Sequence, residues 1–111
     1  MNQLNCLILE GELQKKESID NGVVITVTSS RVFKDADDKI VTSVSAFECE
    51  CYGNFADFAN RIEVGSGVRL VGHLKQKFYE EDGQKKSKVV VICEHLEVKP
   101  HSKKEKKTDE K

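Results

Sequence analysis

Residues 53–67, GNFADFANRIEVGSG, are the stretch of the chain with helical periodicity. Four apolar residues recur there at i, i+3, i+4 and i+7 and so share one helix face: Phe55, Phe58, Ala59 and Ile62. Asn54 is suited to be the N-cap, and Gly65 is a residue type that commonly ends a helix. The pattern predicts one short amphipathic helix whose apolar face packs against the core.

The segments on both sides of this helix alternate with the period of a β-strand. In residues 43–52, SVSAFECECY, one face is expected to hold Phe47, Cys49 and Cys51, and the other Glu48, Glu50 and Tyr52. In residues 69–79, RLVGHLKQKFY, one face is expected to hold Leu70, Leu74 and Phe78. The opposite face holds Arg69, His73, Lys75, Lys77 and Tyr79. This strand therefore has a basic face that ends in an aromatic ring.

Three further strands are expected. Residues 4–14, LNCLILEGELQ, and 22–30, GVVITVTSS, are rich in apolar and β-branched side chains, and residues 86–98, KSKVVVICEHLEV, follow a turn at Asp82-Gly83. Residues 31–43 are expected to form a long solvated loop or a hairpin tip. The element order is that of an all-β domain with one short helix between strands 3 and 4, as in the OB-fold, a five-stranded, partly open barrel. Another small five-stranded barrel is the alternative.

The length of 111 residues fits one domain, which we expect over residues 1–99. Residues 100–111 are expected to be a disordered, lysine-rich tail. The net charge is −1, but residues 99–111 hold six lysines and three acids, so residues 1–98 carry −4. Net charge therefore gives no indication of nucleic-acid binding, which has to be judged from the positions of charges on the surface.

The cysteines are Cys6, Cys49, Cys51 and Cys93, with no C-x-x-C pair and no secretory leader before them. We expect free thiols, a cytoplasmic protein and no membrane segment. A zinc site formed by these cysteines and His95 is an alternative, although their positions favour burial in the barrel core. No orienting group or glycine-rich turn accompanies a pair of one of these cysteines with His73 or His95, so a nucleophilic cysteine is not expected. We expect no enzyme, no metal and no cofactor.

Four segments carry a resemblance to a known family: MNQLNCLILEGEL at 1–13, FECECYGNFADF at 47–58, GSGVRLVGHLKQKFYEEDG at 65–83 and VICEHLEV at 91–98. In this order and spacing, the chain resembles the bacterial single-stranded DNA-binding protein family over roughly residues 1–99. The resemblance implies an OB-fold, a homotetramer, and sequence-tolerant binding of single-stranded DNA in replication, recombination and repair.

The resemblance also implies which side chains bind nucleic acid. Tyr79 and Tyr52 correspond to base-stacking aromatics of the family, and Phe33 lies near a third such position. A fourth stacking position is occupied by Ala46, and the neighbouring Phe47 points to the other face. The cations expected to contact phosphates are Arg69, His73, Lys75 and Lys77. Without the resemblance, the same charged face is more typical of the solvated side of a strand.

Glu48 and Glu50 oppose this interpretation, because strand parity places them on the face of Tyr52. We expect them to pair with Lys75 or Lys77 across the sheet, which removes cations from phosphate binding. The expected consequence is weaker or more salt-sensitive binding than a fully basic groove provides.

Residues 89–93, VVVIC, are apolar on both faces, which predicts a homo-oligomer whose interface uses outward-facing strand residues, including Leu7 and Leu9. The chain ends in KKEKKTDEK and lacks the acidic, apolar-tipped end typical of the family. Recruitment of replication and repair proteins through such a tip is therefore not expected.

Two alternatives stay open. One is an OB-fold protein-interaction subunit, such as a primosome-type accessory factor or a hetero-oligomerising paralogue, with weak nucleic-acid binding. Glu48, Glu50, Ala46 and the absent tip support it. The other is RNA as the ligand, because a stacking platform does not by itself read the 2′-hydroxyl.

Overall fold

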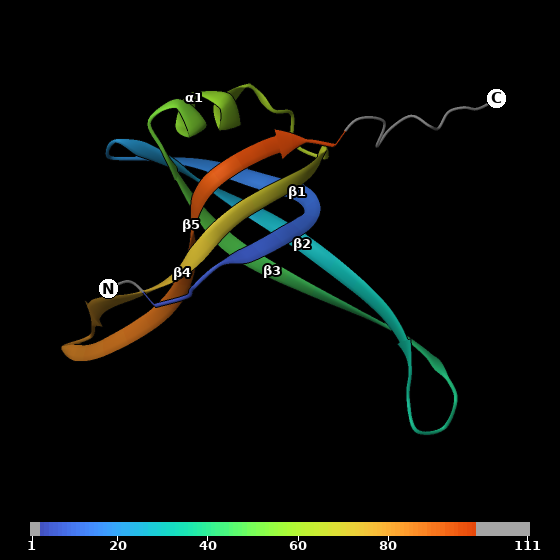
Figure 1. The fold of residues 1–111 in the computed structure, drawn as a ribbon. Helices are drawn as coiled ribbons and strands as arrows, with labels where there is room; N and C mark the ends of the chain where they lie inside the picture. Colours follow the sequence, from blue (N-terminus) through green and yellow to red (C-terminus); the bar gives the residue numbers. More distant parts are fainter. Residues whose placement is uncertain (1–2, 100–111) are drawn as a thin grey trace.

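The structure is a computed structural model that describes residues 3–99 (Figure 1). Its elements are five strands and one helix: β1 (Leu7–Ile19), β2 (Gly22–Lys34), β3 (Ile40–Tyr52), α1 (Asn54–Arg61), β4 (Gly67–Glu81) and β5 (Gln84–Val98). The predicted order, with the helix between strands 3 and 4, is confirmed. Within the described residues no helix is long and apolar enough to cross a membrane. The predicted tail at 100–111 lies outside these residues.

The five strands form a closed barrel in the order β1-β2-β3-β5-β4. All neighbouring strands are antiparallel except β3 and β5, which are parallel and pair at Cys49–Val91 and Glu50–Ile92. The barrel was predicted to be partly open, and this short parallel ladder is what closes it. It also places the face of β3 that carries Glu50 beside the outer face of the β4–β5 hairpin.

Alternating side chains of every strand fill the barrel. The largest fully buried ones in the core are Leu13, Ile25, Leu70, Val27, Val68, Cys49 and Cys51. Helix α1 covers one end of the barrel, where Ala56, Ala59 and Ile62 are buried and Phe55 and Phe58 are partly buried against the core (Figure 1). The predicted apolar helix face is therefore confirmed.

The predicted helix ends are wrong. Gly53 occupies the N-cap position with φ 61°, and its carbonyl oxygen accepts hydrogen bonds from the backbone N–H groups of Ala56 and Asp57. Asn54 is thus the first helical residue and does not cap the helix. The helix ends at Arg61, and Gly65 lies in the turn that follows. A glycine tolerates positive φ without steric cost, which makes Gly53 the better residue for this sharp junction.

Two hairpins project beyond the barrel as separate arms (Figure 1). Residues 31–43 form the end of a hairpin, the second of the two predicted alternatives, but most of them are strand and not loop, because β2 and β3 pair without a break from Gly22–Tyr52 to Lys34–Ile40. Both faces of this arm meet solvent, so its polar sequence hides the strand period. Asp35 closes the tip: its Oδ1 accepts hydrogen bonds from the N–H groups of Asp37 (2.9 Å) and Lys39 (3.0 Å).

The β4–β5 arm turns at Asp82-Gly83, as predicted. Glu81 pairs with Gln84, and both turn residues have positive φ, 55° and 78°. A two-residue turn of this kind fits the twist of an antiparallel hairpin and determines which residues face each other along it. The arm is therefore a defined ribbon whose two faces can be assigned residue by residue.

Strand β1 changes partner along its length. Leu7–Glu12 pair with β4, whereas Glu12–Ile19 pair with β2. Leu7 and Leu9 are partly buried and pack against the core, so their predicted outward position is wrong. Ile8, between them, points outward and is 70% exposed. The short apolar run at this strand gave no parity signal, and the pairing with β4 decides which residues face inward.

Candidate nucleic-acid interface

The outer face of the β4–β5 arm carries a row of lysines. Tyr79 pairs with Lys86, Lys77 with Lys88, and Lys75 with Val90. Directly paired residues of an antiparallel ribbon point to the same side, so this face combines one tyrosine with four lysines: Lys75, Lys77, Lys86 and Lys88. Lys86 and Lys88 were not among the predicted site residues. The register implied by the turn at Asp82-Gly83 was the signal that could have identified them.

A groove of about 570 Å³ separates this face from the end of β3. It is lined by Glu17, Ile19, Asp20, Val24, Glu48, Glu50, Tyr52, Lys77, Phe78, Tyr79 and Lys88. Three of the predicted residues, Tyr52, Lys77 and Tyr79, thus come together from two different strands. The rings of Tyr52 and Tyr79 are 39% and 43% exposed. Two accessible rings in one groove are what stacking of unpaired bases requires.

Glu50 links the two sides of the groove. It is only 6% exposed, its Oε1 accepts a hydrogen bond from the Tyr52 hydroxyl (2.6 Å), and its Oε2 accepts one from the Lys77 ammonium (2.8 Å). Burial alone would raise the pKa of Glu50, but these two hydrogen bonds outweigh it and lower that pKa. The same contacts raise the pKa values of Tyr52 and Lys77.

The predicted pairing of Glu50 with Lys77 is confirmed. Glu48, however, pairs with Lys88 at 3.1 Å and not with a lysine of β4. Lys88 lies on β5, the neighbour of β3 in the barrel order, whereas Glu50 reaches past β5 to Lys77 on β4. Lys75 forms no ion pair within residues 3–99, although its charge contributes to the lowered pKa of Glu50.

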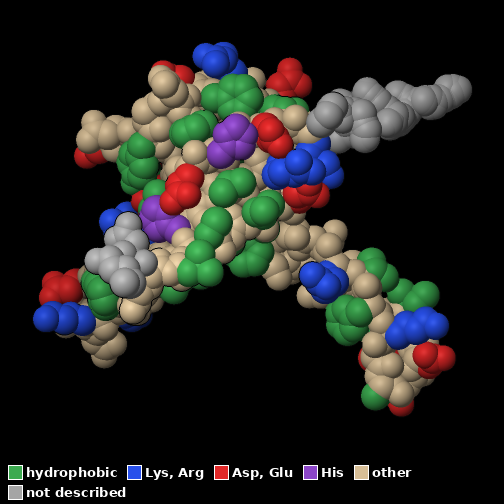
Figure 2. All heavy atoms as spheres, in the orientation of Figure 1, with side chains coloured by type: hydrophobic (Ala, Val, Ile, Leu, Met, Phe, Trp, Pro, Cys, Tyr) green, Lys and Arg blue, Asp and Glu red, His purple; other side chains and the backbone are tan. Residues whose placement is uncertain are grey.

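Arg69 and His73 lie farther along β4, away from the groove lining. The Arg69 guanidinium binds Glu10 at 2.6 Å and Glu97 at 3.4 Å, and His73 binds Glu94. Hydrogen bonding by Glu10 raises the pKa of Arg69. Charges of both signs are interspersed on this β1–β4–β5 face (Figure 2). Both predicted residues are therefore already bound to carboxylates of adjacent strands.

The model of the Single-strand binding protein family matches residues 5–99. This chain belongs to that family. A single-stranded DNA-binding protein of Aquifex aeolicus (strain VF5) is 32% identical over 75 residues, which cover 67% of this chain and 51% of that protein. The chain thus spans about half the length of this curated relative.

Solved structures of family members share the fold. A Plasmodium falciparum SSB complex with ssDNA superimposes with a TM-score of 0.76 at 15% identity, covering 88% of this chain and 96% of that one. The small single-stranded DNA-binding protein of Streptomyces coelicolor gives 0.65 at 17%, covering 90% and 97%. The wild-type protein of Thermus aquaticus gives 0.69 at 22%, covering 86% and 50%. The OB-fold predicted for this family member is confirmed.

Phe33 lies on the other arm of this single-strand binding protein family member. It pairs with Val41 near the tip of the β2–β3 hairpin, is 45% exposed and does not line the groove. Arg31, two residues earlier on the same strand face, is exposed beside Ser43. The structure therefore separates the predicted aromatics into a pair in the groove and a third on a different arm.

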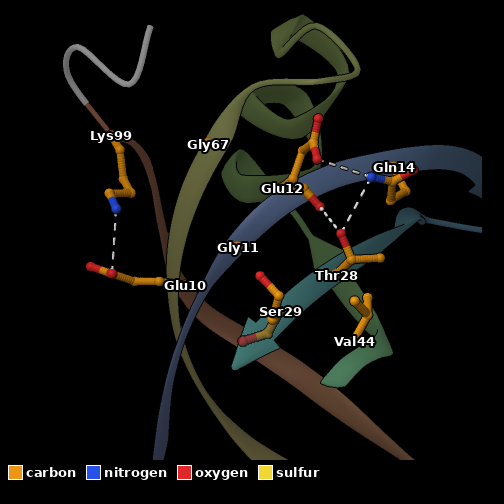
Figure 3. Close-up of a pocket in the computed structure, with 10 residues that line it drawn as sticks. Glu10, Gly11, Glu12, Gln14, Thr28, Ser29, Val44, Gly67 and Lys99 are labelled. Atoms are coloured by element: carbon orange, nitrogen blue, oxygen red, sulfur yellow. Dashed lines mark hydrogen bonds and ion pairs between the residues drawn. The ribbon is translucent and has the colours of Figure 1, made fainter. Parts of the chain in front are cut away.

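A second hollow, of about 620 Å³, lies where β1 crosses β2 (Figure 3). In it, Lys99 binds Glu10 at 3.4 Å, and the Gln14 amide donates to Glu12 (3.2 Å) and Thr28 (3.3 Å). Its lining holds no aromatic ring. It therefore lacks the flat surface on which a base can stack.

Proposed function

We propose that this protein binds single-stranded DNA, without regard to sequence and without catalysis, across the groove between Tyr52 and Tyr79. The observation that carries the proposal is the placement of two accessible rings and the four lysines of the β4–β5 arm on one continuous outer surface. Every base has a π-face and every nucleotide has a phosphate, so such a surface needs no particular sequence. Family membership over residues 5–99 supports it.

In this proposal Tyr52 and Tyr79 stack bases, and Lys75, Lys77, Lys86 and Lys88 contact phosphates. Each stacked base contributes about 1–3 kcal/mol, and each phosphate contact adds a salt-dependent term. Phe33 extends the path to the second arm. Arg69 and His73 contribute less than predicted, because their side chains already bind the carboxylates of Glu10, Glu97 and Glu94.

The proposed role is to cover and protect exposed strands of cytoplasmic DNA during replication, recombination and repair. We test the binding itself by titrating the protein with a long oligo-dT at low salt and following tyrosine fluorescence. The expected result is quenching that weakens with added salt. Tyr79→Ala should lower the affinity by about 1–3 kcal/mol, and Tyr79→Phe, which keeps the ring, should lower it little. Absence of binding at low salt would overturn the proposal.

We further propose that the protein is a homo-oligomer, most simply the tetramer implied by the family resemblance. Leu7–Glu10 pair with β4 but have no pairing partner on their other edge within residues 3–99, and Ile8 is exposed there. A free strand edge beside an apolar side chain is suited to pair with a second copy. Light scattering with and without oligo-dT measures the assembly, and a monomer at micromolar concentration would contradict it.

The alternative, a protein-interaction subunit with weak nucleic-acid binding, is favoured by one observation. The groove lining contains the carboxylates of Glu17, Asp20, Glu48 and Glu50 against the ammonium groups of Lys77 and Lys88. This excess of carboxylates over ammonium groups repels phosphate unless some of the carboxylates are protonated or bound by cations. The two functions differ in their response to oligo-dT: a strand-binding protein shows saturable, salt-sensitive binding, whereas an interaction subunit binds little at any salt concentration.

A further inference from the structure

The ion pair between Glu50 and Lys77 lies where a phosphate would have to bind in the groove. Lys77 is 40% exposed in its side chain and is thus accessible to a ligand, but its ammonium is bound to a carboxylate whose side chain is 7% exposed. A phosphate that binds Lys77 therefore brings a second negative charge next to Glu50. Two anions that share one cation in a partly desolvated site disfavour each other strongly.

We propose that Glu50 is a positioning residue that holds Tyr52 and Lys77 in the free protein and takes up a proton when a nucleic-acid phosphate binds Lys77. This inference rests on the proposed binding of single-stranded DNA. The proton comes from solvent and is held by the carboxylate, so that the buried acid becomes neutral as the phosphate takes over the charge of the lysine. No covalent bond other than that to the proton is made or broken.

The surroundings of Glu50 favour this exchange. On β3 itself, Tyr52 donates to one carboxylate oxygen and Glu48 adds a like charge that Lys88 partly compensates. The cations that face Glu50 from β4 are Lys77 and Lys75. Its register partners on β2 and β5 are the apolar Val24 and Ile92. Across the groove, the remaining charged lining residues are Glu17 and Asp20.

In these surroundings, only the two lysines favour the ionised form of Glu50 electrostatically. When Lys77 turns to a phosphate, Glu50 loses the hydrogen bond and most of the positive charge that oppose its desolvation, so the pKa of Glu50 rises on binding. The complex then binds more protons than the free protein at pH values between the two pKa values. By linkage, the affinity rises as the pH falls through that window, by up to about tenfold per pH unit for one proton.

The experiment measures the affinity of the full chain for an oligo-dT from pH 7.5 down to about pH 4.5 at constant ionic strength. Thymine bases take up no proton in this range. For the wild type, we expect tighter binding at lower pH and net proton uptake, which calorimetry in buffers of different ionisation enthalpy measures directly. For Glu50→Gln, we expect a flat pH profile and an affinity at pH 7 about tenfold above the wild type.

Glu48→Gln is the matched control, because it removes a carboxylate of the same strand face that is half exposed and binds a different lysine. It should keep the pH dependence of the wild type. Wild-type binding without pH dependence or proton uptake would overturn the inference but leave the proposed function intact, as would a slope that persists in Glu50→Gln. No binding of oligo-dT at any pH would overturn both. The calorimetric proton count needs no substitution, so the test holds even if Glu50→Gln is poorly folded.

Discussion

Cys51 on β3 and Cys93 on β5 are buried next to each other inside the barrel, directly after the two residue pairs that close it. The interaction with Cys93 and burial raise the pKa of Cys51, and the interaction with Cys51 lowers the pKa of Cys93. Burial raises the pKa of the neighbouring Cys49 to about 12. The parallel ladder that joins β3 to β5 is therefore backed by two thiols, those of Cys49 and Cys51, whose raised pKa keeps them protonated at neutral pH.

This arrangement predicts which cysteine reacts. A thiol reagent has to reach the sulfur, so at pH 7.5 it should modify the exposed Cys6 rapidly and leave the buried Cys49, Cys51 and Cys93 protected. Mass spectrometry of the native protein should show one fast modification, and Cys6→Ser should abolish it. Two or more rapid modifications without denaturant would show that the seam between β3 and β5 opens readily.

Leu70 and Leu74 lie on the same strand and have the same parity, but only the first is inside the barrel. Leu70 is fully buried, whereas Leu74 is 48% exposed where β4 leaves the barrel. Leu70→Ala should lower the free energy of unfolding by about 2–5 kcal/mol, through lost burial and a residual cavity. Leu74→Ala, the matched control, should cost about 1 kcal/mol or less. Urea denaturation compares the two, and equal losses would contradict the assigned end of the barrel.

Gly72 is required by close approach of β5. A Cβ at this position would lie 2.2 Å from the carbonyl oxygen of Ile92, at the irregular register between Val71 and Gly72. Because the obstacle is backbone, it cannot rotate away. Gly72→Ala should therefore destabilise the protein by about 1–3 kcal/mol. Gln76→Ala, at an exposed site of the same strand, is the control, and thermal unfolding of both variants provides the comparison.

Lys75 and Arg69 are predicted to differ in their effect on the salt dependence of DNA binding. Lys75 lies beside the groove and forms no ion pair in the described part of the chain, whereas Arg69 is compensated by Glu10 and Glu97. Lys75→Ala should reduce the slope of log affinity against log salt by about 0.7, the value for one phosphate on a single strand.

Arg69→Ala is the comparison for this prediction and should leave the slope nearly unchanged. Titrations with oligo-dT at four or more salt concentrations measure both slopes. A larger change for Arg69→Ala than for Lys75→Ala would show that DNA follows the β1–β4–β5 face, away from the groove between the tyrosines.

Much of the fold could be predicted from local sequence. The helical spacing of Phe55, Phe58 and Ile62 identified the helix, and Asp82-Gly83 identified the second hairpin. A hairpin tip at residues 31–43 was one of the predicted alternatives, but the length of its strands was missed, because a two-stranded ribbon exposed on both faces has no reason to alternate apolar and polar residues. Ile8 was missed for the opposite reason, because its neighbours are all apolar.

Part of the candidate site could also be predicted from local sequence, and part depended on the tertiary structure. Strand parity placed Tyr52 with Glu50, and Lys77 with Tyr79, because the direction of a side chain in a strand depends only on its own position. Which charges meet across strands depends on the order of the strands in the barrel. The pairing of β4 with β1 and β5 neutralised Arg69, and the position of β5 next to β3 directed Lys88 to Glu48. Local periodicity thus determined the faces, and only barrel closure decided the neighbours, since contacts between residues far apart in sequence leave no local pattern.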